Sequence, residues 1–92
     1  MHWTWDDRKS LINRRKHGLG FETAQLVFGD LLAVSRHEPH PDEERWQTIG
    51  MISNVIVIVA HTLPGTNDEN GRIISARKAT PRERRLYEEG NF

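Results

Sequence analysis

The chain has 92 residues, of which 36% are hydrophobic and 28% are charged, enough for one small domain with a modest core. It contains no cysteine, which excludes a disulfide framework, a thiolate metal site and a cysteine nucleophile. The start of the chain is charged and has no apolar run, and the longest apolar stretch, Val55–Ala60, is too short to cross a bilayer. We therefore expect a single soluble, cytoplasmic domain over residues 1–92 with no membrane partner.

The charges sum to zero, but they are unevenly distributed along the chain. Thirteen Lys and Arg balance thirteen Asp and Glu. Residues 8–16 contain five cations and no acid, and residues 72–85 contain six cations and one acid. A chain with this charge pattern can present a basic face to a polyanion while it stays neutral overall.

The N-terminal part is predicted to be mostly helical. Residues 2–5 alternate polar and aromatic side chains, as a short strand does. Residues 7–16 favour a helix, with an aspartate at its start and Gly18 after its end as suitable caps. Apolar residues at helical spacing then predict a second short helix over about residues 21–28.

The rest of the chain changes to the pattern of strands. Four are predicted, over residues 31–36, 45–52, 55–62 and 72–78. Ser53-Asn54 suits a two-residue hairpin turn, and residues 63–71 are turn-forming throughout. Residues 55–60 are apolar on both parities, so this strand should lie in the middle of the sheet, with both faces covered.

The strongest local signal predicts a C-terminal helix. Thr80 suits the N-cap, Pro81 the first helical position, and Glu83 completes a capping box. The helix should run to about Glu89 and stop at Gly90. Helices and strands therefore do not alternate, which predicts an α+β fold: a mainly antiparallel sheet with two N-terminal helices and one C-terminal helix.

Several motifs, in this order, resemble those of the BrnT toxins. They are Trp5-Asp6, Asn13, Lys16-His17-Gly18, Phe21 and Ala24, Glu44-Arg45, Ile49-Gly50, the strand ending in His61, Arg72–Ala79, and Glu83, Arg84 and Tyr87. The resemblance implies a small RelE-like domain that is the toxin of a type II toxin–antitoxin system and inhibits translation by cutting RNA. It also implies no cofactor. The expected partner is a BrnA-like antitoxin with a ribbon-helix-helix DNA-binding part, in a heterotetramer that reaches operator DNA only through the antitoxin.

RNA cleavage without a metal needs a base for the 2′-OH proton, a cation for the pentacoordinate phosphate and an acid for the leaving oxygen. The candidate catalytic residues are His61, Arg45, Arg72, Arg77 and Lys78. His61 titrates near neutral pH, although a core histidine bonded to a carbonyl is an equal alternative. Arg45 beside Glu44 is either a phosphate clamp next to a carboxylate base or a surface ion pair.

The candidates in the strand of residues 72–78 are separated by alternation. Arg72 and Lys78 should share one face and Arg77 should lie on the other, so they cannot all reach one phosphate unless a bulge or the strand's end redirects one. The alternative is a solvated strand flank with structural salt bridges.

Further basic residues and one aromatic residue are candidate RNA contacts, namely Lys16, Arg82, Arg84, Arg85 and Tyr87. Arg84 and Tyr87 share a helix face, where they could hold a phosphate and stack on a base. The basic helix of residues 8–16 could steer RNA or dock acidic residues of an antitoxin, and the sequence does not choose between the two.

Two other functions stay open. His37, His40 and Asp42 superficially resemble a metal site, but two prolines hold their segment extended, and we expect a mobile polar loop with no metal. A metal-dependent nuclease using residues 37–44 is therefore the weakest hypothesis. The stronger alternative is a module that binds nucleic acid or a partner protein and does no chemistry.

Overall fold

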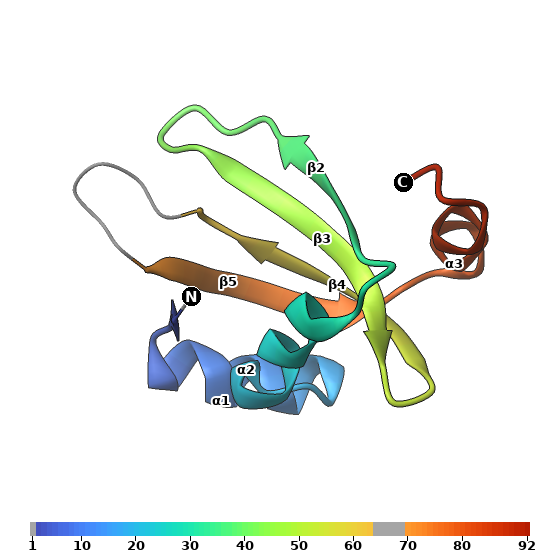
Figure 1. Cartoon of the computed structure of the whole chain (residues 1–92). Helices are drawn as coiled ribbons and strands as arrows, with labels where there is room; N and C mark the ends of the chain where they lie inside the picture. Colours follow the sequence, from blue (N-terminus) through green and yellow to red (C-terminus); the bar gives the residue numbers. More distant parts are fainter. Residues whose placement is uncertain (1, 64–69) are drawn as a thin grey trace.

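The computed structural model describes residues 2–63 and 70–92 (Figure 1). The elements in this part of the chain are β1 (Trp3–Thr4), α1 (Asp7–His17), α2 (Phe21–Ala24), the 3-10 helix η1 (Gln25–Gly29), β2 (Val34–Glu38), β3 (Arg45–Ile52), β4 (Val55–His61), β5 (Gly71–Lys78) and α3 (Pro81–Glu89). The sheet has the order β1-β5-β4-β3-β2. Only β1 pairs in parallel, with β5. The predicted α+β class with a mainly antiparallel sheet is confirmed.

The predicted caps set the ends of the two longer helices. The Asp6 carboxylate accepts from the Lys9 amide at 3.1 Å, and Gly18 closes α1 in the left-handed conformation with φ of 72°. Thr80 and Glu83 form the predicted capping box of α3, and Gly90 ends that helix with φ of 71°. No helix in the described ranges is long and apolar enough to span a membrane.

The segment after α1 differs from its prediction in two ways. The second helix is α-helical only as far as Ala24 and continues as the tighter η1. The predicted strand over residues 31–36 is wrong at its start, since β2 begins at Val34. Its first residues form a turn because Asp30 accepts hydrogen bonds from the amides of Leu32 and Ala33, at 2.9 and 3.1 Å. Most of the turn-rich segment over 63–71 lies outside the described residues.

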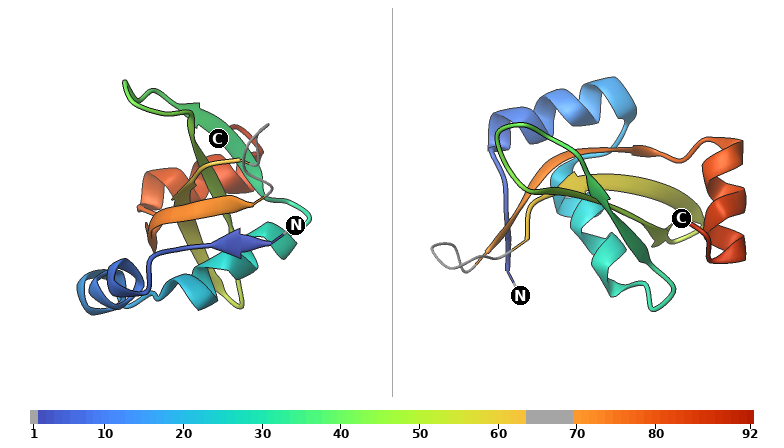
Figure 2. Two further views of the ribbon diagram at one scale, coloured as in Figure 1. Left: turned by 90° about the vertical axis from the view of Figure 1, so that its left-hand side faces the viewer. Right: turned by 90° about the horizontal axis from the view of Figure 1, so that it is seen from above.

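The core lies on both faces of β4, the middle strand, as predicted. On one face Val57 and Val59 pack with Phe21 and other residues of α2 and η1. We call this the α2 face. On the other, Ile56 and Ile58 pack with Tyr87 of α3, and we call it the α3 face. Figure 2 shows that α1 and α2 lie together, away from α3.

One irregularity in β5 decides which way its side chains point. Ala60 pairs with Ser75, but the next residue, His61, pairs with Ile73, so Ile74 is an extra residue with no partner on β4. Ile73 and Ala76, three residues apart, are consequently both buried in the core of the α2 face. The strand therefore contains a β-bulge, which shifts its alternation by one position.

Candidate functional site

The bulge puts Arg72 and Arg77 on the same face of the sheet. Arg72 precedes Ile73, and Arg77 follows Ala76. Both of these neighbours are buried on the α2 face, so both arginines point to the α3 face. Lys78 points the other way, because it pairs with Val57 of the α2-face core. The prediction that Arg72 and Lys78 share a face opposite Arg77 is therefore wrong, because it assumed regular alternation.

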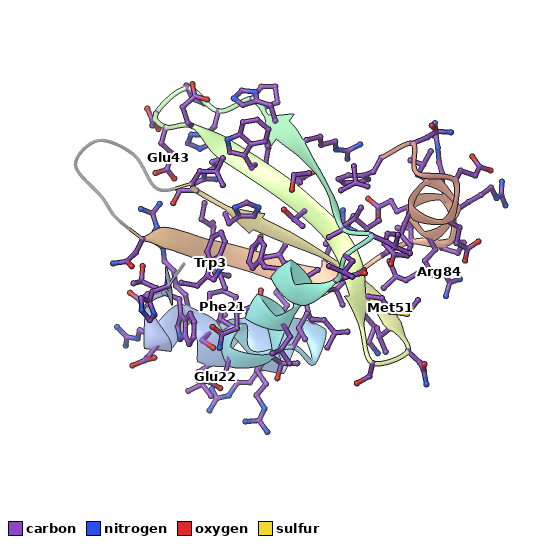
Figure 3. The ribbon with its side chains drawn as sticks, in the orientation of Figure 1. Trp3, Phe21, Glu22, Glu43, Met51 and Arg84 are labelled. Carbon is purple, nitrogen blue, oxygen red and sulfur yellow. The ribbon has the colours of Figure 1, made fainter. Side chains whose placement is uncertain are left out.

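Glu43 joins Arg45 and Arg72 through one carboxylate. Its Oε1 accepts from Arg45 Nε at 2.9 Å, and both of its oxygens accept from Arg72 Nη2 at 2.9 Å. Figure 3 shows Glu43 in the loop between β2 and β3. The side chain of Arg72 is 45% exposed and that of Glu43 is 29% exposed, so solvent and a ligand can reach them. We call these three residues the Arg45–Glu43–Arg72 cluster.

The hydrogen bonds of the cluster favour the ionised form of its carboxylate. Arg72 first, and then Arg45, holds the pKa of Glu43 below its ordinary value. The sequence prediction paired Arg45 with Glu44 instead. In the structure Glu44 binds His37, with Glu44 Oε2 at 2.8 Å from His37 Nε2.

Sheet pairing explains why Arg45 and Arg72 meet although they are far apart in the sequence. Trp46 and Ile73 both pair with His61, from opposite sides of β4. Arg45 and Arg72 each precede one of these residues, so they flank the end of β4 and both point to the α3 face.

His61 is buried on the other side of the sheet from this cluster. The residue is 1% exposed, and its ring lies edge-on to Trp3 and Phe28. Nδ1 donates to the Thr62 carbonyl at 2.9 Å, which leaves Nε2 to accept from the Thr48 hydroxyl at 2.6 Å. Burial lowers the pKa of His61. These are the contacts of a core histidine bonded to a carbonyl, the alternative to an acid or base.

Arg77 binds the first turn of α3. Its two terminal nitrogens donate to the two oxygens of Glu83 at 2.7 and 2.9 Å, and Glu83 Oε1 also accepts from the Thr80 amide. The pair lowers the pKa of Glu83 to about 2, with the Arg77 hydrogen bond as the largest cause. The Arg77 side chain is still 40% exposed.

Tyr87 does not share an exposed face with Arg84. The residue is only 8% exposed and packs in the core with Ile49, Ile56 and Ile58. Its hydroxyl donates to Asp30, and this hydrogen bond raises the pKa of Tyr87 to about 12. The ring therefore has no open face on which a base could stack.

The remaining basic candidates lie away from the cluster. Lys78, Arg84 and Arg85 line a groove of about 720 Å³ together with Met51 and Val55. Figure 3 shows Arg84 and Met51 at the opposite end of the molecule from Glu43. The two other candidates, Lys16 in the last turn of α1 and Arg82 in the first turn of α3, are exposed.

The loop of residues 37–44 does not bring three metal ligands together. His37 binds Glu44, and His40 Nδ1 accepts from the amide of Asp42 at 3.2 Å. Within residues 2–63 and 70–92, no group of three or more His, Asp or Glu side chains could hold a metal ion.

Comparison with protein families gives a match over residues 5–83, most of the chain, to the family described as "Ribonuclease toxin, BrnT, of type II toxin-antitoxin system". The chain belongs to the BrnT family. It is therefore a ribonuclease toxin of the type II systems, with RNA as its substrate and an antitoxin as its partner. No curated protein matches it. The matched range includes the three residues of the Arg45–Glu43–Arg72 cluster.

Two residues of the site region were missed by the sequence analysis. Neither Glu43 nor Asp30 is among the candidate residues drawn from the sequence. Their partners Arg72 and Tyr87 are 29 and 57 positions away along the chain. No local pattern marks such contacts, although the spacing of the strands could have suggested that the loop before Arg45 reaches the start of β5.

Proposed function

We propose that this BrnT toxin is a metal-independent endoribonuclease that inhibits translation, and that its scissile phosphate binds at the Arg45–Glu43–Arg72 cluster. The observation that supports this site is that one carboxylate bridges two guanidinium groups at a solvent-exposed end of the sheet. Two guanidiniums that hold a carboxylate at 2.9 Å have the spacing and charge to hold a phosphate in its place.

Arg45 and Arg72 supply the positive charge for the reaction. Negative charge builds up on the phosphate oxygens as the pentacoordinate state forms, and two fixed cations stabilise that state more than they stabilise the substrate. A divalent metal is not needed for this role.

Glu43 acts as the base for the 2′-OH proton. Its carboxylate is ionised near neutral pH, as an ordinary glutamate is, and Arg72 and Arg45 lower its pKa further. When a phosphate takes over the guanidinium hydrogen bonds, this cause of the lowered pKa is removed, and the proton affinity of Glu43 rises beside the substrate. The carboxylate thus becomes a stronger base when RNA is bound.

The reaction is an internal transfer on RNA. The 2′-oxygen bonds to phosphorus as its proton moves to Glu43, and the bond from phosphorus to the 5′-oxygen breaks. Water protonates that oxygen, and the hydroxide so formed takes the proton from Glu43, which restores the carboxylate. The products are a 2′,3′-cyclic phosphate and a 5′-hydroxyl. Arg77 lies further along the same face and contacts the phosphate of a nearby nucleotide, whereas the exposed cations of α3 contact longer RNA.

The test uses end-labelled single-stranded RNA in EDTA, without ribosomes. We expect the parent to cut it, Arg72→Ala to cut about 100-fold more slowly or worse, and Glu43→Gln to lose about 100-fold in rate with little change in RNA affinity. Arg77→Ala should raise the RNA concentration needed for half-maximal rate more than it lowers the maximal rate. Arg14→Ala, an exposed arginine on α1, is the matched control and should cut like the parent.

The outcomes also separate the alternatives. Parent protein that shifts RNA on a gel and leaves it intact, in every condition, would be the binding module without chemistry. Cleavage that appears only with Mg²⁺ would contradict metal independence. If cleavage needs ribosomes, the same variants are compared with ribosomes present. Cleavage by Arg45→Ala and by Arg72→Ala at the rate of the parent would exclude the cluster as the cleavage site.

The proposed antitoxin is BrnA-like, with a ribbon-helix-helix part that binds operator DNA while the toxin does not. The expected complex is a heterotetramer. Mass measurement of the complex purified from co-expression checks the stoichiometry. Operator binding by the complex, and none by the toxin alone, checks the division of roles.

A further inference from the structure

Helix α1 buries polar residues and exposes apolar ones. Ser10 and Asn13 are its only buried residues. Leu11 and Ile12, its large apolar residues, are 48% and 54% exposed. A surface helix ordinarily turns its apolar side chains to the core, so this arrangement is reversed.

The reversed orientation is fixed by hydrogen bonds. The Asn13 side-chain amide donates to the carbonyls of Leu19 and Ala76 at 2.7 and 2.8 Å, and its oxygen accepts from the Ala76 amide. Ser10 Oγ accepts from the Phe21 amide at 2.8 Å. These bonds tie α1 to β5 and to α2, so the helix cannot rotate to bury Leu11 and Ile12 without leaving buried polar groups unpaired.

The outward side of α1 combines these apolar residues with cations. Residues 8, 11, 12 and 15 follow at helical spacing, so Leu11 and Ile12 lie between Arg8 and Arg15. In the described part of the chain, no ion pair joins a cation of α1 to a carboxylate. The helix lies at the periphery in all three views, with no other element over its outer side (Figures 1 and 2). We call residues 8, 11, 12 and 15 the outer face of α1.

The chemistry of this face fits a protein better than RNA. Cations alone are enough to bind phosphates, and exposed leucine and isoleucine side chains add nothing to that contact. A peptide with carboxylates around apolar side chains would satisfy the cations and cover the apolar pair. We propose that the outer face of α1 docks an acidic, apolar-containing segment of the antitoxin.

This proposal rests on the proposed function for the identity of the partner, but not for the site of cleavage. Asn13 binds Ala76 from the α2 face, whereas Arg45 and Arg72 point to the α3 face. Binding of the antitoxin at α1 therefore anchors it across the sheet from the proposed site of cleavage. Variants of the two surfaces should be separable in experiment.

The test measures affinity for the antitoxin encoded with the toxin, on the full-length toxin purified from the complex. Leu11→Ser combined with Ile12→Ser should weaken binding about tenfold or more, because the complex loses the burial of two apolar side chains. Arg8→Gln combined with Arg15→Gln should weaken it by a similar factor. Lys9→Gln combined with Arg14→Gln, the same charge change on the flanks of the helix, is the control and should bind like the parent.

RNA cleavage without antitoxin is measured on the same proteins and should equal that of the parent for all three double variants. Unchanged antitoxin affinity of the Leu11/Ile12 variant overturns the proposal. So does loss of RNA binding in the Arg8/Arg15 variant with antitoxin affinity intact, which would make α1 an RNA surface. A parent that binds antitoxin at α1 but cuts no RNA would contradict the proposed cleavage site and leave the docking face standing. Melting temperatures confirm that each variant is folded.

Discussion

At the scale of single residues, the surroundings of two titratable side chains assign them opposite roles. His61 is buried among aromatic rings, and this burial favours its neutral form although the hydrogen bond to the Thr62 carbonyl opposes it. Glu43 is held by two guanidiniums at the surface, which favour its charged form. Histidine is the usual acid–base candidate by residue type. In the proposed site the carboxylate, and not the imidazole, meets the phosphate.

The lowered pKa of His61 predicts a loss of stability in mild acid. In the folded state the pKa of His61 lies below its ordinary value of 6.5, whereas in the unfolded state it is near 6.5. The stability that neutral His61 contributes is therefore complete above about pH 6.5. It is lost as the pH falls towards the pKa of His61 in the folded state. Urea unfolding should show a free energy that decreases from about pH 7.5 to about pH 5.5.

Two variants attribute that decrease to His61. His61→Gln, which cannot titrate, should be less stable than the parent at neutral pH but should have a smaller pH slope. His17→Gln, a change of an exposed histidine on α1, should keep the slope of the parent. Equal slopes for His61→Gln and the parent would contradict the assignment.

At the scale of elements, β5 connects β1, α1 and α3 to the sheet. Gly71 lies under the ring of Trp3 in β1, Ala76 is bonded by Asn13 of α1, and Arg77 is paired with Glu83 of α3. Each link uses a different residue of the same strand. Changes in β5 should therefore loosen several elements at once.

Gly71→Ala tests the first of these links. A Cβ at this position would lie 2.2 Å from Trp3 Cζ3, so the indole ring must move, and with it the stacking of Trp3 on Phe28. We expect a loss of about 1–3 kcal/mol in the free energy of unfolding, measured in urea. Gly29→Ala is the control, because nothing lies within 4 Å of its added Cβ. A loss at Gly29 as large as at Gly71 would show that the ring contact is not the cause.

The elements also show what the sequence can predict. The caps of α1 and α3, the Ser53-Asn54 turn and the central place of β4 were predicted correctly, because each depends on neighbouring residues or on the hydrophobicity of one segment. A bulge in β5 was left open without a position, and the bridge through Glu43 and the burial of Tyr87 were missed. They depend on contacts between segments, which no local pattern contains.

At the scale of the whole molecule, a net charge of zero conceals two separate basic surfaces. Arg45, Arg72 and Arg77 lie on the α3 face, and the cations of α1 lie across the sheet. Acidic residues such as Glu43 and Glu83 are paired with the first group. RNA affinity should therefore depend on where a cation lies, and not on the overall charge.

Salt dependence checks this separation of the two surfaces. For single-stranded nucleic acid, the slope of log affinity against log salt concentration changes by about 0.7 for each phosphate contact. Arg72→Gln should reduce the slope for RNA binding by about that amount, and Arg15→Gln, with the same charge change, should leave it unaltered. An equal reduction in both variants would mean that RNA responds to total charge alone.

The unpaired Ile74 in β5 also bears on how this strand should be aligned with those of related toxins. The bulge absorbs one residue locally, so a chain without it could keep the same side chains on the same faces of a regular strand. Such a chain would be one residue shorter here and would need a gap opposite position 74. An ungapped alignment would match Arg72 to a residue that points to the α2 face instead of the α3 face. The position of gaps in this strand is therefore as informative about Arg72, the proposed phosphate-binding arginine, as the identity of the aligned residues.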